Sequence, residues 1–593
     1  MKMKALLLLS SLLMIAFSSS AQYTEKSLID NSPVVYSEII DQYIQLDNKY
    51  AEAKLIEYGK SDNGKPIHLF VISTNKIFNV DSLKKQGFAV LFINNGIHPG
   101  EPDGIKASLR LSSELLKKQI PSPEKTVICI VPIYNVDGAL ETSQFFRSGQ
   151  NGPNEVGFRG NARHLDLNRD FIKCDSENAK TFTKMYRDWD PDVFVDTHVS
   201  DGADYQYTIT LIDSQKDKLH PEISKVMQGK VLPFLYEQME KSGFPITPYV
   251  NVWGEDPEKG MSGFLESPRY ASGYSALYNA FPFVTETHML KPFPQRIEAT
   301  YQFLKANVLL CESSGNEIRT ARKKANEQIA KTQIDFPLHW KLDSTKVDSL
   351  NFRGYKALKK KSEVTSLDIL YFDQQQPFQK NIAFYNTFKS SISVKKPLAY
   401  LIPQAWHEVI DRLKLNRVEM FQLNHDTLFN AACYYIKNYN TGKSAYEGHY
   451  LHNNVNVVSD TALIRCYAGD YIIYCNQNCN RYIIETLEPH APDAFFAWNF
   501  FDEILQQKEY FSDYLWDDVA IEFLKEHPAI KEEFEEKKRK DSTFAASTWA
   551  MYSWIFERSK WYEPSHLRYP VLRLDHKIPE NMLQNKTNKI SNN

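Results

Sequence analysis

A histidine and a glutamate three residues apart, in the segment HPGE from His98 to Glu101, are the first pair in this sequence that could do chemistry. They follow the apolar run Phe92-Ile93 and a turn containing Gly96, and a helix is expected to begin directly after them. Open α/β sheets build their sites at the carboxyl ends of strands. An imidazole and a carboxylate in such a turn can converge on one point, and zinc accepts both ligand types. Because short HxxE matches also arise by chance, this pair alone predicts little.

Two further strand ends supply a third ligand and a base. The apolar segment that begins at Val193 ends in His198. Two histidines and one carboxylate leave the fourth tetrahedral position open for water, which is the catalytic arrangement of zinc. The run Phe281–Thr285 ends in Glu286, which is expected to take the proton of the attacking water and return it to the leaving amine. Taken singly, His198 is equally well a hydrogen-bonded core histidine, and Glu286 a solvent-facing glutamate. The combination favours a zinc hydrolase.

The loop from Arg159 to Phe171 concentrates three arginines and two asparagines. Salt bridges on a surface loop are one explanation. A guanidinium group, however, binds a carboxylate through two parallel hydrogen bonds, and a substrate with a free C-terminal carboxylate requires such a clamp. The loop therefore indicates a carboxylate-binding role beside the predicted metal site.

The order of these motifs resembles the zinc metallocarboxypeptidase family typified by carboxypeptidase A, whose catalytic domain is called the funnelin fold. The ordered set is HPGE, NVDG (Asn135–Gly138), RxNAxxLDLNRDF, a strand ending in histidine, and FVTE. The resemblance covers about residues 40–312 and does not extend to the rest of the chain. It implies one zinc ion per chain, peptide substrates with a free C-terminal carboxylate, and hydrolysis of the C-terminal peptide bond.

Carried over motif by motif, the resemblance implies that His98, Glu101 and His198 are the zinc ligands and that Glu286 is the general base. It implies that Asp166 orients the first histidine from outside the ligand set.

The resemblance also implies that Asn168 and Arg169 grip the terminal carboxylate of the substrate. An upstream arginine in the family polarises the scissile carbonyl. Arg159 fits that role by its spacing to the Asn-Arg pair, with Arg147 and Arg163 as alternatives.

A mobile tyrosine caps the bound substrate in this family, and here its position is open among three tyrosines that precede Glu286. We favour Tyr274 over Tyr270 and Tyr278, because a glycine beside Tyr274 permits loop movement. The stretch from Ser143 to Phe158 is longer than the compact form of the family motif. The side-chain specificity of the pocket therefore stays open.

The elements that must position these residues alternate between short apolar runs and amphipathic stretches of helical length, from about residue 50 to residue 300. This rhythm is typical of an α/β fold with a mixed, mostly parallel sheet sandwiched by helices. We expect a carboxypeptidase-like catalytic domain at residues 22–315, closed by a helix at Gln295–Gly315. A separate α+β region is expected at residues 316–593. Its predicted parts are a small α/β piece at about 397–425, a β-rich part at 455–490 and a helical part at 494–562.

The N-terminus carries the layout of a cleavable signal peptide at residues 1–21. Two lysines precede an apolar run from Ala5 to Phe17, and small residues follow it up to Ala21. The run is shorter than the roughly 20 residues that a spanning helix needs. The protein is therefore expected to be exported, periplasmic or extracellular, with no stable membrane insertion after cleavage. A formal net charge of −3 argues against a nucleic-acid partner.

Two other functions remain as alternatives. A zinc amidohydrolase or deacylase acting on cell-wall peptides or small amides would use the same metal and base. An inactive binding module is the other alternative. Inactive relatives usually lose a ligand or the base, whereas all four groups are present here. The oligomeric state and the role of residues 316–593 stay open.

Overall fold

The structure is a computed structural model that describes residues 29–252 and 255–587. The chain divides into two compact units. The first unit runs to Phe171 and also contains Asp175–Ala325 and Leu342–Phe388, and the second contains Ile172–Cys174, Asn326–Lys341 and Lys389–Asn593. The predicted signal peptide lies outside the described residues. Within the described ranges, we find no helix that is both long and apolar enough to cross a membrane.

A seven-stranded sheet forms the centre of the first unit. Its strands lie in the order β1 (Ala53–Lys60), β2 (Pro66–Ile72), β4 (Thr126–Val131), β3 (Ala89–Asn94), β7 (Val193–Ser200), β10 (Phe281–His288) and β8 (Ile209–Asp213). The four central strands are parallel to one another, and antiparallel strands complete both edges. The predicted mixed, mostly parallel sheet is therefore confirmed.

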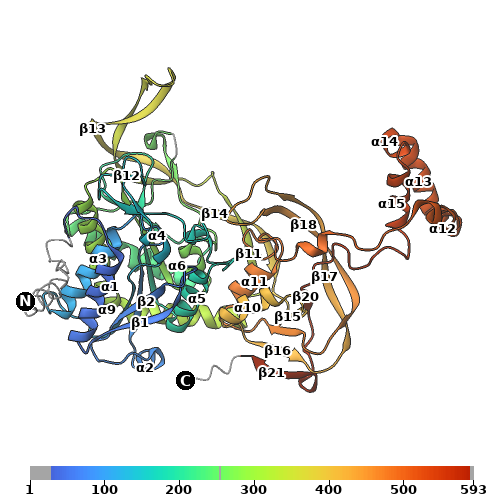
Figure 1. Ribbon diagram of the computed structural model, residues 1–593, viewed down its shortest axis with the longest axis horizontal. Helices are drawn as coiled ribbons and strands as arrows, with labels where there is room; N and C mark the ends of the chain where they lie inside the picture. The colour runs from blue at the N-terminus through green and yellow to red at the C-terminus, as the bar shows by residue number, and fades with distance from the viewer. Residues whose placement is uncertain (1–28, 253–254, 588–593) are drawn as a thin grey trace, which may run out of the picture. The chain divides into compact units, whose positions relative to one another are not determined.

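Helices cover both faces of this sheet (Figure 1). Alternate residues of each strand point to opposite faces. Leu91 and Ile93 therefore join one apolar cluster, whereas Phe92 packs its ring 5.9 Å from that of Phe182 on the other side. The first face is covered by α1 (Tyr36–Lys49), α3 (Asp103–Leu116), α7 (Leu232–Lys241) and α9 (Phe293–Lys331), and the second by α5 (Glu177–Trp189) and α8 (Ala271–Ala276).

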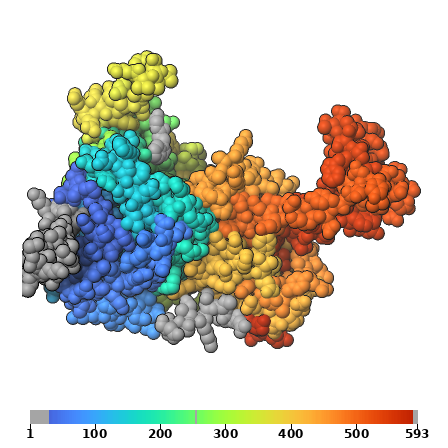
Figure 2. Space-filling model, viewed as in Figure 1, coloured from blue at the N-terminus to red at the C-terminus, as the bar shows by residue number. Residues whose placement is uncertain are grey.

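The boundary predicted at residue 315 falls inside α9, which runs from Phe293 to Lys331. The chain then returns to the first unit as a long antiparallel ribbon of β12 (Asp348–Lys361) and β13 (Asp368–Tyr385). The short strand β9 (Met261–Ser262) pairs with the end of β13. The outer part of the ribbon stands clear of the body of the unit in Figure 2. The predicted accessory region therefore contains a segment that belongs to the first unit.

The second unit has its own seven-stranded sheet, in the order β18, β17, β20, β15, β19, β16, β21. The predicted small α/β piece is present as β15 (Ala399–Ile402), α10 (His407–Leu415) and β16 (Met420–Leu423). The predicted β-rich part contains β18 (His452–Cys466) and β19 (Tyr471–Tyr474), but it ends in the buried helix α11 (Asn480–Leu487), where strands were expected. The second unit also contains β17 (Thr427–Thr441), β20 (Leu572–Leu574), β21 (Leu583–Thr587) and the helices α12 (Asp513–Glu526), α13 (Pro528–Lys540), α14 (Ser542–Ala545) and α15 (Thr548–Phe556).

Candidate active site

His98 and Glu101 lie in the turn between the end of β3 and the start of α3. The helix begins close against β7, because Gly104 leaves room there. A Cβ atom at Gly104 would lie 2.0 Å from the Oγ1 atom of Thr197. His198 directly follows Thr197 in β7. This close approach brings the turn with two of the predicted ligands up to the strand that carries the third.

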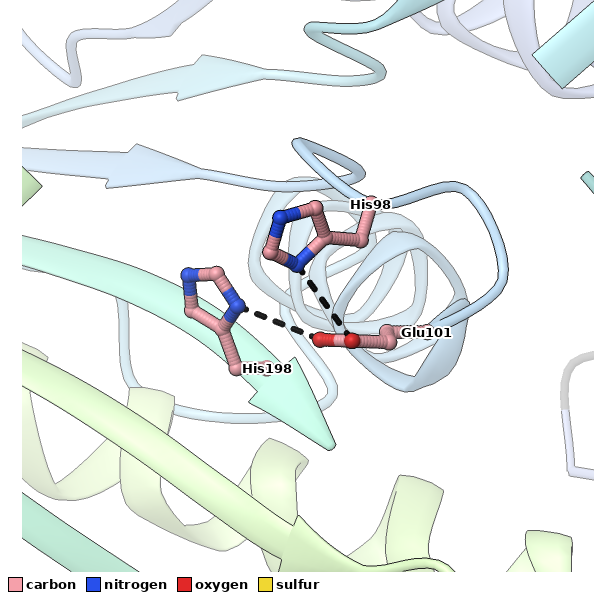
Figure 3. Close-up of side chains that lie close together, drawn as sticks. All are labelled: His98, Glu101 and His198. Atoms are coloured by element: carbon pink, nitrogen blue, oxygen red, sulfur yellow. Dashed lines mark hydrogen bonds and ion pairs between the residues drawn. The ribbon is translucent and has the colours of Figure 1, made fainter. Parts of the chain in front are cut away.

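The three predicted zinc ligands converge on one point (Figure 3). The Nδ1 atom of His98 lies 3.3 Å from Oε1 of Glu101, and the Nδ1 atom of His198 lies 3.1 Å from Oε2. The candidate ligand atoms all lie within 4.8 Å of one another. All three side chains are buried, each with at most 4% of its surface exposed. Two inward-facing nitrogens and a carboxylate are a donor set that zinc accepts.

The outer nitrogen of each imidazole faces a carboxylate. The Nε2 atom of His98 lies 2.8 Å from Asp166, and that of His198 lies 2.9 Å from Asp196. A proton on each Nε2 atom leaves the lone pair of Nδ1 directed inward, which is the tautomer that a metal requires. Among the described residues, the buried Nδ1 atom of His98 has no hydrogen-bond partner. The residues present therefore fit a zinc ion.

Positive groups surround the carboxylates of the site. Burial would raise the pKa of Glu101, but His98 and then Arg147 hold that pKa well below its ordinary value. Arg147 donates to Oε1 of Glu101 at 2.9 Å and to the Val199 carbonyl at 2.8 Å. Burial would likewise raise the pKa of Asp166, yet His98 and Arg159 hold it far below its usual range. Both carboxylates are therefore ionised at neutral pH.

Glu286 lies beside this group on the neighbouring strand. β10 pairs with β7 in parallel register, with Glu286 opposite His198. Register partners in a sheet point to the same face. Burial is the largest influence on this carboxyl and raises its pKa to about 7, against the opposing effect of His198. A carboxyl group with such a pKa can accept and release a proton near neutral pH.

A cavity of about 450 Å³ opens onto the three converging ligands. Its lining includes Asn168 and Arg169, so the structure brings the predicted carboxylate clamp to the predicted metal site. The Oδ1 atom of Asn168 accepts a hydrogen bond of 3.2 Å from the Ala271 backbone N–H. The guanidinium group of Arg169 stacks over the ring of Tyr270, 4.5 Å from its centroid. The complete lining is His98, Glu101, Arg147, Arg159, Asn168, Arg169, His198, Val199, Ser200, Asp201, Ile212, Tyr249, Asn251, Phe264, Tyr270, Ala271, Ser272, Val284 and Glu286.

The three candidates for the carbonyl-polarising arginine differ in position. Arg159 lies in the cavity wall and donates to Asp166 at 3.1 Å and to Glu101 at 3.3 Å. Arg147 also lines the cavity. Arg163 does not, and it donates instead to the Asp175 carbonyl. The geometry therefore leaves Arg159 and Arg147 as candidates.

The structure does not place Tyr274, the tyrosine predicted to cap the substrate, at the cavity. Its side chain is fully buried in the core, with its ring 5.7 Å from Phe171 and 5.4 Å from Tyr186. Tyr270 lines the cavity instead. A glycine neighbour indicates where a backbone could move, but it does not indicate which tyrosine faces the substrate.

Sequence reasoning missed Asp196 and did not predict that Arg147, named there only as a possible carbonyl-polarising arginine, contacts Glu101. Asp196 lies two positions before His198 on the same strand and therefore on the same face, a period-two signal that could have identified it. Arg147 comes from the long stretch after Ser143, where no motif marked it as a partner of Glu101.

Comparisons with known proteins agree with the geometry of the site. Residues 40–228 match the family model described as zinc carboxypeptidase. The carboxypeptidase 2 of Trichophyton tonsurans is 21% identical over 460 residues, which is 74% of this chain and 78% of that protein. Because that alignment covers so much of the chain, the likeness extends past residue 312, where the motif resemblance was expected to end.

Solved carboxypeptidase structures are also similar to this chain. A metallo-carboxypeptidase from Burkholderia cenocepacia is 15% identical, with a TM-score of 0.35, over 47% of this chain and 70% of that one. The carboxypeptidase A of Helicoverpa armigera is 15% identical, with a TM-score of 0.35, over 50% and 75% of the two chains. The family model, the curated relatives and the converging His-Glu-His group are the stronger findings. Together they show that residues 40–228 match the zinc carboxypeptidase family and that the curated relatives of this chain are carboxypeptidases, which supports a metallocarboxypeptidase.

Proposed function

We propose that this protein is an exported enzyme that removes the C-terminal residue of peptides, with His98, Glu101 and His198 as zinc ligands and Glu286 as general base. The observation that supports this most is the convergence of the three ligand side chains at a cavity that Glu286 and Arg169 also line. Export is proposed from the N-terminal sequence pattern alone.

Each residue of the site has a separate part in the proposed reaction. A bound zinc ion would act as a Lewis acid toward the scissile carbonyl and would make water more acidic. Glu286 takes a proton from the attacking water and delivers it to the leaving amine. Arg159 donates hydrogen bonds to the negative charge that develops on the carbonyl oxygen. Asp166 keeps the ring of His98 in its binding orientation.

Asn168 and Arg169 hold the terminal carboxylate, and the next part of the cavity receives the C-terminal side chain. Val284 and Ile212 are register partners on β10 and β8. Val284 lies two residues before Glu286 on β10, and Ile212 lies two residues after Thr210, the partner of Glu286 on β8. Both therefore lie on the same face of the sheet as Glu286, about 7 Å along the strands. Val284, Ile212 and Phe264 are apolar side chains in the lining of the cavity. The proposed substrates therefore end in an apolar residue.

The carboxylate clamp yields a prediction for Arg169→Ala. This substitution is expected to lower kcat/KM on peptides with a free C-terminus by roughly 10²-fold, because truncating one partner of a hydrogen-bonded charge pair costs about 2–5 kcal/mol. Paired peptides with free and amidated C-termini would be compared by initial rates. Wild type is expected to prefer the free form, and the variant should lose most of that preference.

Arg163→Ala is the matched control, because Arg163 lies in the same loop but outside the cavity. It should retain the wild-type preference. If wild type cut amidated peptides as fast as free ones, the clamp assigned to Arg169 would be rejected.

A further inference from the structure

The ribbon of β12 and β13 has a buried base and an exposed outer part. Phe352 in β12 and Ile382 and Phe384 in β13 are buried, with 0%, 4% and 7% of their surfaces exposed. Val364 and Leu367 in the connection between the two strands are 93% and 67% exposed. The ribbon is therefore packed at its base, which we define by the buried residues Phe352, Ile382 and Phe384.

The base of the ribbon packs against the back of one wall of the substrate cavity. Val250 and Val252 share an apolar cluster with Phe352 and with neighbouring residues of the ribbon. Tyr249 and Asn251, which alternate with those valines, line the cavity. One short segment therefore contacts the cavity with alternate residues and the ribbon with the residues between them.

A second segment of the same wall is hydrogen-bonded to the ribbon. β9 pairs with Phe384 and Tyr385 of β13, and the Gly263 N–H donates to the Tyr385 carbonyl at 2.9 Å. A Cβ atom at Gly263 would lie 2.1 Å from the Oδ1 atom of Asn386, so a larger residue there would displace the Asn386 side chain. Phe264, the next residue, lines the cavity. The ribbon thereby fixes the backbone that presents the Phe264 ring.

These wall residues connect to the carboxylate clamp through aromatic contacts. The Phe264 ring lies 6.0 Å from that of Tyr249 and 5.8 Å from that of Tyr270, edge to face in both cases. Tyr270 in turn lies under the guanidinium group of Arg169. A displacement of the wall at Phe264 would therefore reach the part of the cavity that receives the C-terminal residue.

We infer that the base of the β12–β13 ribbon is a positioning element of the substrate pocket, which sets how tightly the enzyme holds a large apolar C-terminal side chain. The inference rests on the proposed carboxypeptidase function and deepens it. Phe352 and Ile382 act through Tyr249, Asn251 and Phe264 and do not contact the substrate themselves. Selectivity between large and small C-terminal residues is the property they control, since a pocket discriminates by the fit of its walls.

The test uses full-length Phe352→Ala and Ile382→Val, with Phe352→Leu as the conservative variant and Val364→Ala at the exposed connection as the control. The measured quantity is the ratio of kcat/KM for two acyl-dipeptides that differ only in a C-terminal Phe or Ala. This ratio is expected to fall on the order of 10-fold in Phe352→Ala, the scale on which small changes of fit in an apolar pocket alter selectivity. Phe352→Leu should recover most of the ratio, and Val364→Ala should leave it unchanged. Zinc content should stay the same in all variants.

A loss of stability alone would lower activity on both substrates by the same factor and leave the ratio unchanged. An unchanged ratio in Phe352→Ala would therefore overturn the inference while the proposed function stands. If Phe352→Ala does not fold, the same ratio is measured in Ile382→Val and Gly263→Ala. An unchanged ratio in both of these variants would also overturn the inference. If wild type hydrolyses neither substrate nor any other C-terminal bond, the proposed function fails and the inference fails with it.

Discussion

Replacing Glu286 with glutamine is expected to lower kcat by roughly 10²- to 10⁴-fold, the usual contribution of a general acid–base group. Glutamine has nearly the same shape as glutamate but cannot accept the proton of the attacking water. Glu286 lines the cavity beside the converging ligands and is not a member of that group. Zinc content and thermal stability should therefore remain close to those of wild type.

Steady-state kinetics and metal analysis of the same preparations would test this prediction. Glu141→Gln is a suitable control, because Glu141 is an exposed glutamate outside the cavity. Its kcat should match that of wild type. A Glu286→Gln enzyme that kept more than about a tenth of the wild-type kcat would contradict the role of general base.

Replacing either of the histidines proposed to bind zinc with alanine is expected to remove the metal and to reduce hydrolysis to background. His98 and His198 each supply one of the inward-facing nitrogens, and a zinc site with only two protein ligands holds the ion poorly. Asp166→Asn should have a smaller effect, a roughly 10- to 100-fold loss of zinc affinity, because Asp166 contacts His98 and is not itself a proposed ligand. Metal content by mass spectrometry and chelator competition would rank the three variants.

His164→Ala is the matched control for the histidine substitutions, since His164 is exposed and lies outside the cavity. It should keep its zinc. If His98→Ala and His198→Ala both retained zinc at the wild-type level, the ligand set would have to be abandoned.

The core of the candidate site could be predicted from the sequence because its signals are local. His198 and Glu286 each stand at the end of an apolar run, and parallel strands bring such ends to one edge of a sheet. The metal-site geometry thus follows from short motifs and strand order. Which tyrosine lines the cavity does not follow from the sequence, because Tyr270 and Tyr274 lie four residues apart and packing against α5 distinguishes them.

The boundary predicted at residue 315 differs from the structure, because α9 continues past it to Lys331. The segment after residue 315 continues α9, with Ile318, Ala321 and Ala325 buried at helical spacing and most of its charged residues exposed. Apolar residues spaced three and four positions apart predict a helix, so the continuation of α9 could have been identified from the sequence. The return of the ribbon to the first unit could not be predicted in this way, because the apolar cluster that contains Phe352 and Val250 joins residues about 100 positions apart. A truncation at the predicted boundary would therefore remove part of the pocket support along with the second unit.

The most direct test of the central claim is the product pattern of the purified full-length protein on a peptide with a free C-terminus, followed by mass spectrometry. The account predicts stepwise loss of single residues from the C-terminus, fastest at apolar residues, with loss of activity on treatment with a zinc chelator and recovery when zinc is restored. Cleavage within the peptide, or an unchanged rate in the chelator, would contradict the assignment of His98, Glu101 and His198 as the metal site of a carboxypeptidase.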